Sequence, residues 1–286
     1  MSASEPVIIG LGAELAEMHG TVATIGSVRQ NTTRQLAFEI LTYGLSDRHR
    51  RRLRRAAGPH PVRFYAMGRT AVLDGLGGRD WEWRRILLAS VVEQPRCLFL
   101  DSDLLVRGDV GELWDMPMED VLAATPDQYF STAALRGGPL PECGADAMYG
   151  NCGVLMMDLD RLRTLPVAEQ TPSAVAAWGA DLQARDQDVL NLLFQGNIGP
   201  LPATWNQLFP FVHNCRDPKV VHFIGDVWPL RSRHFLSDMA YRSELLATAS
   251  AGTGDVQLRA LGYLESALSP IRRLRRAVRR TRSRSG

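Results

Sequence analysis

Two acids one residue apart, Asp101 and Asp103, follow the apolar run CLFL at residues 97–100. In an extended segment, residues i and i+2 point the same way, so the spacing predicts two carboxylates on one side of the chain while Ser102 faces away. Neighbouring carboxylates repel unless a cation neutralises them, and oxygen ligands suit Mg²⁺ or Mn²⁺. The alternative is structural: the acids cap the following turn or pair with Arg107.

The elements that must position these acids are predicted from hydrophobic patterning. Strands are expected at 7–11, 36–41, 97–101, 121–127, 152–159 and 219–223, and helices at 13–29, 45–58, 81–92 and 186–196. Ser46 or Asp47 is expected to cap the second helix, with Gly58 just past its end, and Gly196 to end the last. This alternation indicates an α/β sheet, whose ligands lie beyond the carboxyl ends of the strands.

The composition is that of an ordinary globular protein, with 286 residues of which 45% are hydrophobic and 22% are charged. We expect a cytoplasmic location, because neither a membrane-spanning apolar run nor a cleavable leader is apparent. The four cysteines lack CxxC spacing, so neither a disulfide nor a zinc site is expected; they are Cys97, Cys143, Cys152 and Cys215.

Residues 270–286 form a basic appendage with eight arginines and no acid, and without these arginines the formal charge of +2 becomes −6. Ile271, Leu274 and Val278 recur at helical spacing, so a helix would carry them on one side and arginines around the rest. Such a helix suits the anionic inner face of a cell membrane. A solvated tail, or one that binds RNA without specificity, is the alternative.

Four segments together resemble glycosyltransferase family 8, in their order and approximate separations. They are FLDSDLLVRGDVGELWD (99–115), YGNCGVLMMDLDRLR (149–163), DQDVLNLLFQGNIGPLPATWN (186–206) and VVHFIGDVWP (220–229). The resemblance begins near residue 80, and the family includes bacterial lipopolysaccharide galactosyl- and glucosyltransferases. It implies a single GT-A domain with a Rossmann-like mixed sheet over 1–250, an extension over 251–286, and transfer of a sugar from a nucleotide donor with retention of configuration.

The resemblance also implies the site residues. The metal ligands would be Asp101, Asp103 and His222, holding Mn²⁺ or Mg²⁺ against the donor diphosphate; without the family context, a lone histidine ending a strand is more often structural. Donor contacts would come from Arg84, Ser102, Asn151, Gly153, Gly225 and Trp228. Gly225 would allow close approach of the backbone to a phosphate. Arg84 lies seventeen residues before Asp101, which is the family spacing for an arginine that contacts the donor, although Arg85 could be the one that points inward. Without the resemblance, an arginine pair on such a helix would be expected at the solvated surface.

The residues that contact the donor sugar would be Asp127, Asp186 and Gln187. The alternative for the two acids is that they only cap a helix or a turn. Asn151 and Gly153 are otherwise a simple turn before a strand. An amide is a poor nucleophile, and no obvious nucleophilic carboxylate is present. We therefore expect the acceptor to attack the anomeric carbon from the same face from which the leaving group departs. This mechanism is favoured over the double displacement that retaining glycosidases use.

Two positions depart from the family pattern. The acid at the end of the first strand is replaced by Glu14 at best, and the aromatic residue that stacks on uracil is missing near residue 17. Trp228 stands where the family has a lysine, so Arg231 or Arg233 would have to supply the cation. UDP-glucose and UDP-galactose are the expected donors, but the base is left open by these departures.

Two other classes of protein share part of this pattern. A catalytically degenerate relative would bind a nucleotide sugar or a partner without transfer, but the reactive residues are all present. A nucleotidyltransferase would need a basic glycine-rich loop after the first strand, and GLGAELAEMHG (10–20) is followed by no cation until Arg29. The acceptor would be a glycan, a lipid-linked sugar or a small molecule, and the loop at 137–150 is expected to bind it. No specific nucleic acid is expected.

Overall fold

The computed structural model describes residues 5–67, 83–128, 148–178, 182, 184–194, 197–209 and 214–224. Its strands are β1 (Val7–Glu14), β2 (Leu36–Tyr43), β3 (Val62–Ala66), β4 (Arg96–Leu100), β5 (Leu104–Val106), β6 (Leu122–Pro126), β7 (Gly150–Asp158), β8 (Ile198–Pro200), β9 (Gln207–Leu208) and β10 (Val220–His222). Its helices are α1 (Met18–Asn31), α2 (Asp47–Ala57), α3 (Arg84–Val91), α4 (Val110–Trp114), α5 (Leu159–Arg163), α6 (Val167–Trp178) and α7 (Asp186–Leu193), with a 3-10 turn at Ala203–Trp205.

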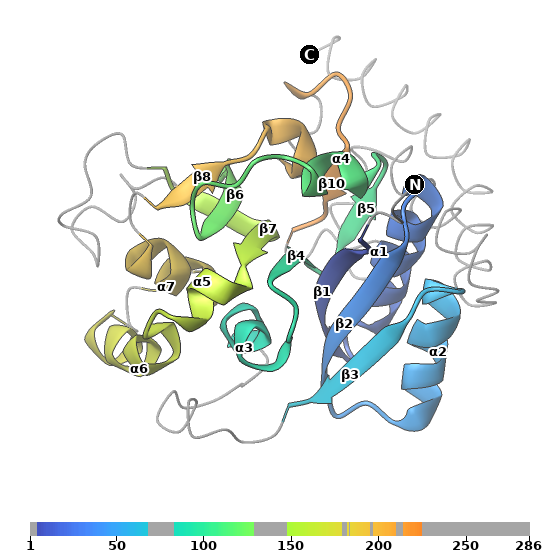
Figure 1. Ribbon diagram of the computed structural model, residues 1–286, viewed down its shortest axis with the longest axis horizontal. Coiled ribbons are helices and arrows are strands. Elements are labelled where there is room, and N and C mark those ends of the chain that lie inside the picture. Colours follow the sequence, from blue (N-terminus) through green and yellow to red (C-terminus); the bar gives the residue numbers. More distant parts are fainter. Residues whose placement is uncertain are drawn as a thin grey trace, which may run out of the picture.

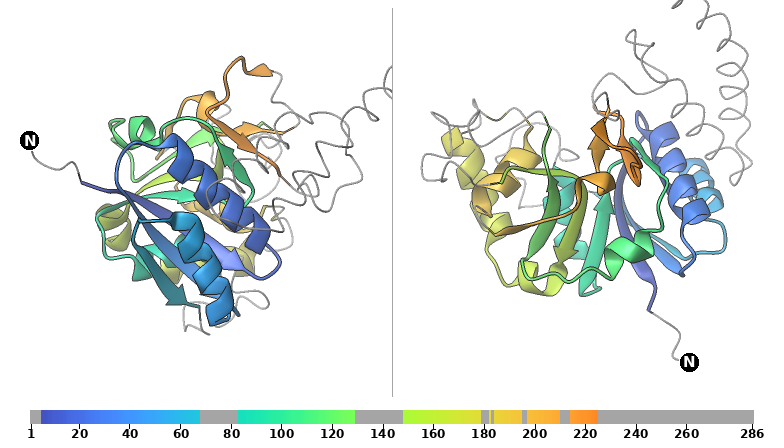
Figure 2. Two further views of the ribbon diagram at one scale, coloured as in Figure 1. Left: turned by 90° about the vertical axis from the view of Figure 1, so that its right-hand side faces the viewer. Right: turned by 90° about the horizontal axis from the view of Figure 1, so that it is seen from above.

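A seven-stranded mixed sheet in the order β3-β2-β1-β4-β7-β6-β8 organises the chain (Figure 1). Strands β3, β2, β1 and β4 are parallel, while β7 runs antiparallel to both β4 and β6. A smaller sheet, β5-β10-β9, lies beside α1 (Figure 2). The carboxyl ends of β1, β2 and β4 therefore meet at one edge, which confirms the α/β sheet predicted from the sequence.

Helices cover both faces of the large sheet, as a mostly parallel sheet requires. Helices α1 and α2 pack on one face, and α3, α5, α6 and α7 pack on the other (Figure 1). Helix α1 is buried nearly all round and carries hydroxyls that bind the chain beyond β4. Thr24 Oγ1 donates to the carbonyl of Asp101 at 3.3 Å, and Ser27 Oγ accepts from Val106 N at 3.0 Å. These bonds fix the segment that contains the two acids.

Close packing of α3 on the sheet depends on the glycines of β1. A Cβ at Gly12 would lie 2.1 Å from Cδ of Arg84, and one at Gly10 would lie 2.4 Å from a methyl carbon of Leu88. These glycines give α3 room to bring its first residues, Arg84 and Arg85, against the end of β4.

All six predicted strands and all four predicted helices are present, with shifted bounds. The first strand continues to Glu14, so the first helix begins at Met18 rather than at residue 13. Ser46 is the N-cap residue of α2, and Gly58 follows its end with a φ of 67°, as predicted. The last predicted helix ends earlier than expected, because Phe194 leaves helical geometry before Gly196 is reached. The elements that were not predicted are strands β3, β5, β8 and β9 and helices α4, α5 and α6.

The expectations about the cysteines and about membrane-spanning segments can be compared with the described residues only in part. Cys97 and Cys152 are fully buried, whereas Cys143 lies outside the described residues. Among the described helices, none combines the length and the apolarity needed to cross a membrane. The division at residue 250 and the basic segment 270–286 lie outside the described residues and stay predictions.

Candidate active site

Three potential metal ligands converge at the carboxyl end of β4. Ligand atoms of Asp101, Asp103 and His222, here called the metal wall, all lie within 4.8 Å of one another. Nε2 of His222 is 3.2 Å from Oδ1 of Asp103 and 3.8 Å from Oδ2 of Asp101. The two acids lie in a turn between β4 and β5, not in the extended segment that was expected. Pairing of β5 with β10 carries His222 to them.

Two arginines at the start of α3 compensate the buried acids. Arg85 donates to Oδ2 of Asp101 and, at 2.6 Å, to Oδ1 of Asp186, while Arg84 lies 3.5 Å from Oδ1 of Asp101. Asp101 therefore pairs with these two arginines, whereas Arg107 donates to the carbonyl of Pro218 and pairs with Asp217. Arg85 is the arginine that points into the site, as the sequence allowed.

Burial and the arginines set the charge states at this wall. Burial alone would raise the pKa of Asp101, but Arg85 and Arg84 outweigh it and hold that pKa below its usual range. For Asp186, burial raises the pKa and Arg85 offsets it only in part. Burial would lower the pKa of His222, yet Asp103 and Asp101 reverse the shift and raise it.

Beside the metal wall lies a hydrogen-bonded cluster, here called the amide wall, which consists of Asp127, Asn151, Gln187 and Asn206. Asn151 Nδ2 donates to Asp127 Oδ2 at 2.7 Å, and Gln187 Nε2 donates to the same oxygen at 3.1 Å. Gln187 Oε1 accepts from Cys152 N at 2.9 Å. These contacts hold the amide of Gln187 by both of its ends.

Asn206 joins the two walls. Its Oδ1 lies 2.9 Å from Nδ1 of His222, and its Nδ2 donates to Oδ1 of Asn151 at 2.7 Å. With Nδ1–H of His222 donating to Asn206, the Nε2 atom is the one that faces the two carboxylates. Gly153 provides the room for this ring, because a Cβ there would lie 2.2 Å from Cε1 of His222.

Residues of both walls line one cavity of about 250 Å³. Its other lining residues are Arg85, Ala184, Leu208 and Ile224. Asp186 is not among the lining residues, and it does not cap α7, since Arg185 is the N-cap residue and Asp186 the first helical one. Its carboxylate pairs with Arg85 because α3 packs against α7, and its Oδ2 atom has no hydrogen-bond partner.

Glu17, rather than the expected Glu14, is the acid of the first loop that reaches the site. Its Oε2 accepts from the hydroxyl of Ser102 at 2.9 Å, and its Oε1 lies 3.8 Å from Nη2 of Arg84. The hydroxyl of Ser102 thus binds Glu17, and Ser102 is not among the residues that line the cavity, so its predicted contact with the donor stays a prediction. Burial raises the pKa of Glu17, against the opposing effect of Arg84. Glu17 lies close to where the family has the aromatic residue that this chain lacks.

Sequence reasoning missed Asn206 and Tyr149. The hydroxyl of Tyr149 donates to Asp188 at 2.5 Å and accepts from Gln187 at 3.2 Å. Both residues stand inside or beside segments that carried the family resemblance, but neither belongs to a motif with a chemical signature of its own. Gly225, Trp228, Arg231, Arg233 and residues 137–147 of the expected acceptor loop lie outside the described residues.

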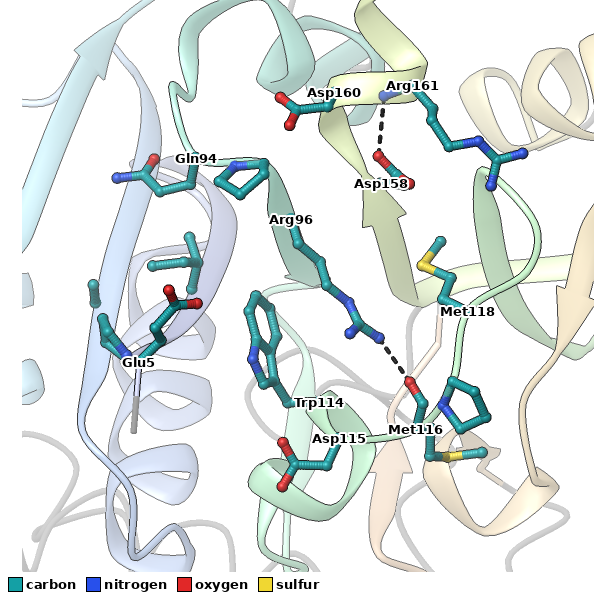
Figure 3. Close-up of a pocket in the computed structure, with 15 residues that line it drawn as sticks. Glu5, Gln94, Arg96, Trp114, Asp115, Met116, Met118, Asp158, Asp160 and Arg161 are labelled. Atoms are coloured by element: carbon teal, nitrogen blue, oxygen red, sulfur yellow. Dashed lines mark hydrogen bonds between the residues drawn. The ribbon is translucent and has the colours of Figure 1, made fainter. Parts of the chain in front are cut away.

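A second, larger cavity of about 920 Å³ lies away from this site (Figure 3). The guanidinium of Arg96 lies over the ring of Trp114 at 5.1 Å and donates to the carbonyl of Met116. Two of its acids already have partners, since Asp115 pairs with Arg34 and Asp160 with an arginine of α5. Among the described residues, the cluster of acids and histidine that could hold a metal ion lies at the metal wall and not in this cavity.

The fold places the chain among GT-A glycosyltransferases. It resembles the structure of the galactosyltransferase LgtC in complex with donor and acceptor sugar analogues, with a TM-score of 0.73 at 21% identity, over 89% of this chain and 100% of that one. The bifunctional glycosyltransferase WbbM, in its apo form, gives a TM-score of 0.74 at 16% identity, over 91% of this chain and 52% of that one.

The model of glycosyl transferase family 8 matches residues 18–231, so the chain belongs to this family. Glycosyltransferase GlyF of Streptococcus pneumoniae is 23% identical over 149 residues, which are 49% of this chain and 35% of that protein. Lipopolysaccharide 1,2-glucosyltransferase of Escherichia coli is 25% identical over 122 residues, 43% and 36% of the two proteins. The chain thus spans little more than a third of the length of these curated relatives.

Proposed function

We propose that the protein transfers a hexose from a nucleotide diphosphate donor to an acceptor hydroxyl, with retention of configuration and with a divalent cation at the metal wall. The observation that carries this proposal is that metal wall and amide wall face one cavity. One wall suits a diphosphate held through a cation, and the other suits the hydroxyls of a sugar. A GT-A glycosyltransferase needs both within the length of one nucleotide sugar.

The metal wall fits Mn²⁺ or Mg²⁺ by the chemistry of its donors. Two carboxylates supply hard oxygen ligands, and His222 presents Nε2 because Asn206 holds its other nitrogen. When bound, the cation would neutralise the donor diphosphate and the charge that grows on the leaving nucleoside diphosphate. Arg85 and Arg84, beside Asp101, add positive charge at the same end of the cavity.

The amide wall is proposed to orient the sugar. Asp127 and Asn151 offer acceptor and donor groups for hydroxyls, and their mutual hydrogen bond fixes their rotamers before the sugar arrives. Asp186 does not line the cavity in this structure, but its buried Oδ2 atom has no hydrogen-bond partner among the described residues, and we propose that this atom accepts from a sugar hydroxyl.

Gln187 is proposed to lie beside the anomeric carbon and to stabilise the positive charge that develops there. Its amide is too weakly basic to form a covalent intermediate readily, so we favour same-face attack. The bond between the anomeric carbon and the phosphate oxygen breaks, with the electron pair leaving on the nucleoside diphosphate. The acceptor oxygen bonds to the same face of that carbon, and its proton passes to the departing phosphate oxygen.

The finer identities are also proposals. UDP-glucose and UDP-galactose remain the expected donors, and the names of the relatives favour a glycan acceptor, such as a bacterial envelope or lipid-linked sugar. Contact of residues 270–286 with the inner face of the cell membrane would bring the protein to such an acceptor.

Donor hydrolysis by the purified protein with Mn²⁺ tests the proposal directly. The screen would cover UDP-glucose, UDP-galactose, UDP-N-acetylglucosamine and the GDP and dTDP sugars, with Asp103→Ala as the control. Metal-dependent release of one nucleoside diphosphate, lost in the control, is the expected result. If no donor is cleaved, donor binding is measured by calorimetry, and cleavage is tested again with a panel of lipid-linked and free sugars as acceptors. A donor that binds but is not cleaved with any of these acceptors would overturn the proposed transfer and favour a degenerate binding protein.

A further inference from the structure

Helix α2 presents a row of arginines to solvent. Six of its eleven residues are arginine and only one is acidic. Leu53, Ala56 and Ala57 face the core, so Arg48, Arg51 and Arg55 share the opposite face at spacings of three and four. At 1.5 Å per residue the row spans about 10 Å.

Nothing in the described part of the chain neutralises this row. Arg50 and Arg54, on the flank of the helix, do have a partner, because their guanidinium groups lie over the ring of Phe64 at 5.9 and 4.8 Å from its centre. Among the described residues, no carboxylate lies within ion-pair distance of Arg48, Arg51 or Arg55. Like charges three or four residues apart destabilise a helix, so the row costs stability unless an anionic partner covers it.

Exposed apolar side chains lie where β1 and β2 end, at the edge of the sheet from which the chain leads into α2. Leu15 is 61% exposed and Tyr43 47%, and they account for two of the three large hydrophobic residues that are exposed in the described ranges. They are neighbours, because Tyr43 pairs with Glu14 in the register of β1 and β2. Tyr43 also lies only four residues before α2.

We propose that the outer face of α2, together with Leu15 and Tyr43, is a docking surface for an anionic phospholipid bilayer. The arginines would lie against the headgroups, while the leucine and the tyrosine ring would enter the interface between headgroups and acyl chains. This surface belongs to the folded domain and is separate from the contact predicted for residues 270–286.

A bilayer fits this surface better than a nucleic acid does. An exposed leucine gains nothing from a phosphate backbone, and the row lacks acceptor side chains such as Asn or Gln that read base edges. The carboxyl ends of β1, β2 and β4 meet at one edge, so Leu15, Tyr43 and the metal wall share it. Docking would therefore hold the cavity of the site close to the membrane.

The test compares two charge-matched double variants of the full chain on vesicles of phosphatidylcholine, with and without phosphatidylglycerol. Arg51→Gln/Arg55→Gln should weaken partitioning onto the anionic vesicles about 25-fold, roughly fivefold for each cation. Arg63→Gln/Arg216→Gln removes two exposed arginines elsewhere and should change it less than about threefold. Equal losses in both variants, or no loss in the first, would overturn the proposal.

A second pair of variants tests the apolar part. Leu15→Ser/Tyr43→Ser should weaken partitioning roughly tenfold, and the loss should persist at high salt because it does not depend on charge. Leu165→Ser changes the other exposed apolar residue and should have no effect. Binding of poly(U) RNA is measured in parallel; if the arginine variant loses RNA binding while its vesicle binding is unchanged, the surface serves a nucleic acid and the proposal is wrong.

Discussion

The metal wall and the amide wall of the site are held by different forces. Asp101, Asp103 and His222 are charged or chargeable groups, and two arginines restrain their mutual repulsion. The amide wall is held by hydrogen bonds that the neutral amides of Asn151 and Gln187 donate to the single carboxylate of Asp127. Losing one charge from the first wall should therefore change the electrostatics of the whole cavity, whereas losing one amide should disturb local geometry.

The largest effect is expected from Asp103→Ala. Asp103 is the ligand with the greatest exposure, at 29% of its side chain, and no arginine in the described part of the chain pairs with it. Its loss removes one of three ligands, and turnover should fall roughly a thousandfold. Donor hydrolysis and Mn²⁺ titration measure the change. Asp115→Asn, at an exposed acid that pairs with Arg34, is the control and should leave both quantities unaltered.

Gln187→Ala tests the amide wall at its reactive end. Turnover should fall about a hundredfold, since the amide acts on charge that appears only in the transition state, while the Kd of the donor should change by less than about threefold. Steady-state rates and calorimetry separate the two quantities. An unchanged turnover number would contradict the role given to Gln187.

Gly153→Ala acts on the metal wall from β7, the strand that also carries Asn151 of the amide wall. A Cβ at this position would lie 2.2 Å from His222 Cε1, so the imidazole must turn away from the two acids. Mn²⁺ affinity should fall about 10- to 100-fold, as when the orientation of a ligand is lost. Gly199→Ala, where the nearest atom is a carboxylate oxygen of Asp120 at 2.9 Å, should leave the affinity unchanged.

The two walls also differ in how far the sequence predicts them. The pair Asp101 and Asp103 is visible as a motif because both acids follow one strand, and the resemblance supplied His222. Their convergence depends on the pairing of β5 with β10, which links residues more than a hundred positions apart. Strand β5 is only three residues long, too short for a hydrophobic pattern to reveal it.

The amide wall could be predicted less completely. Asn206 follows a 3-10 turn and lacks any pattern of its own, so only the fold shows that it lies between His222 and Asn151. The same holds for Asp186: an acid opening a helix suggests a cap, but packing of α3 against α7 turns it toward Arg85. Tertiary contacts of this kind override local preference because a buried charge must be paired.

Variants of Asn206 separate its two contacts. Asn206→Asp keeps an oxygen for His222 but loses the donor to Asn151, so Mn²⁺ affinity should be retained while turnover falls about tenfold. Asn206→Leu loses both contacts and should weaken Mn²⁺ binding as well, roughly tenfold. If the two variants behave alike in metal titration, Asn206 does not orient His222.

The smallest effect, and the one opposite in sign, is expected from Glu17→Gln. The amide keeps an acceptor for the hydroxyl of Ser102, but it removes a negative charge 3.8 Å from Arg84. Arg84 then interacts with one carboxylate fewer, and a diphosphate meets less repulsion. Affinity for the nucleoside diphosphate should rise roughly two- to fivefold, the size expected of one partly solvated charge. Calorimetry with UDP and GDP measures it; a fall in affinity would mean instead that the carboxylate of Glu17 contacts the nucleotide itself, and a fall for one base alone would make Glu17 the residue that selects the donor.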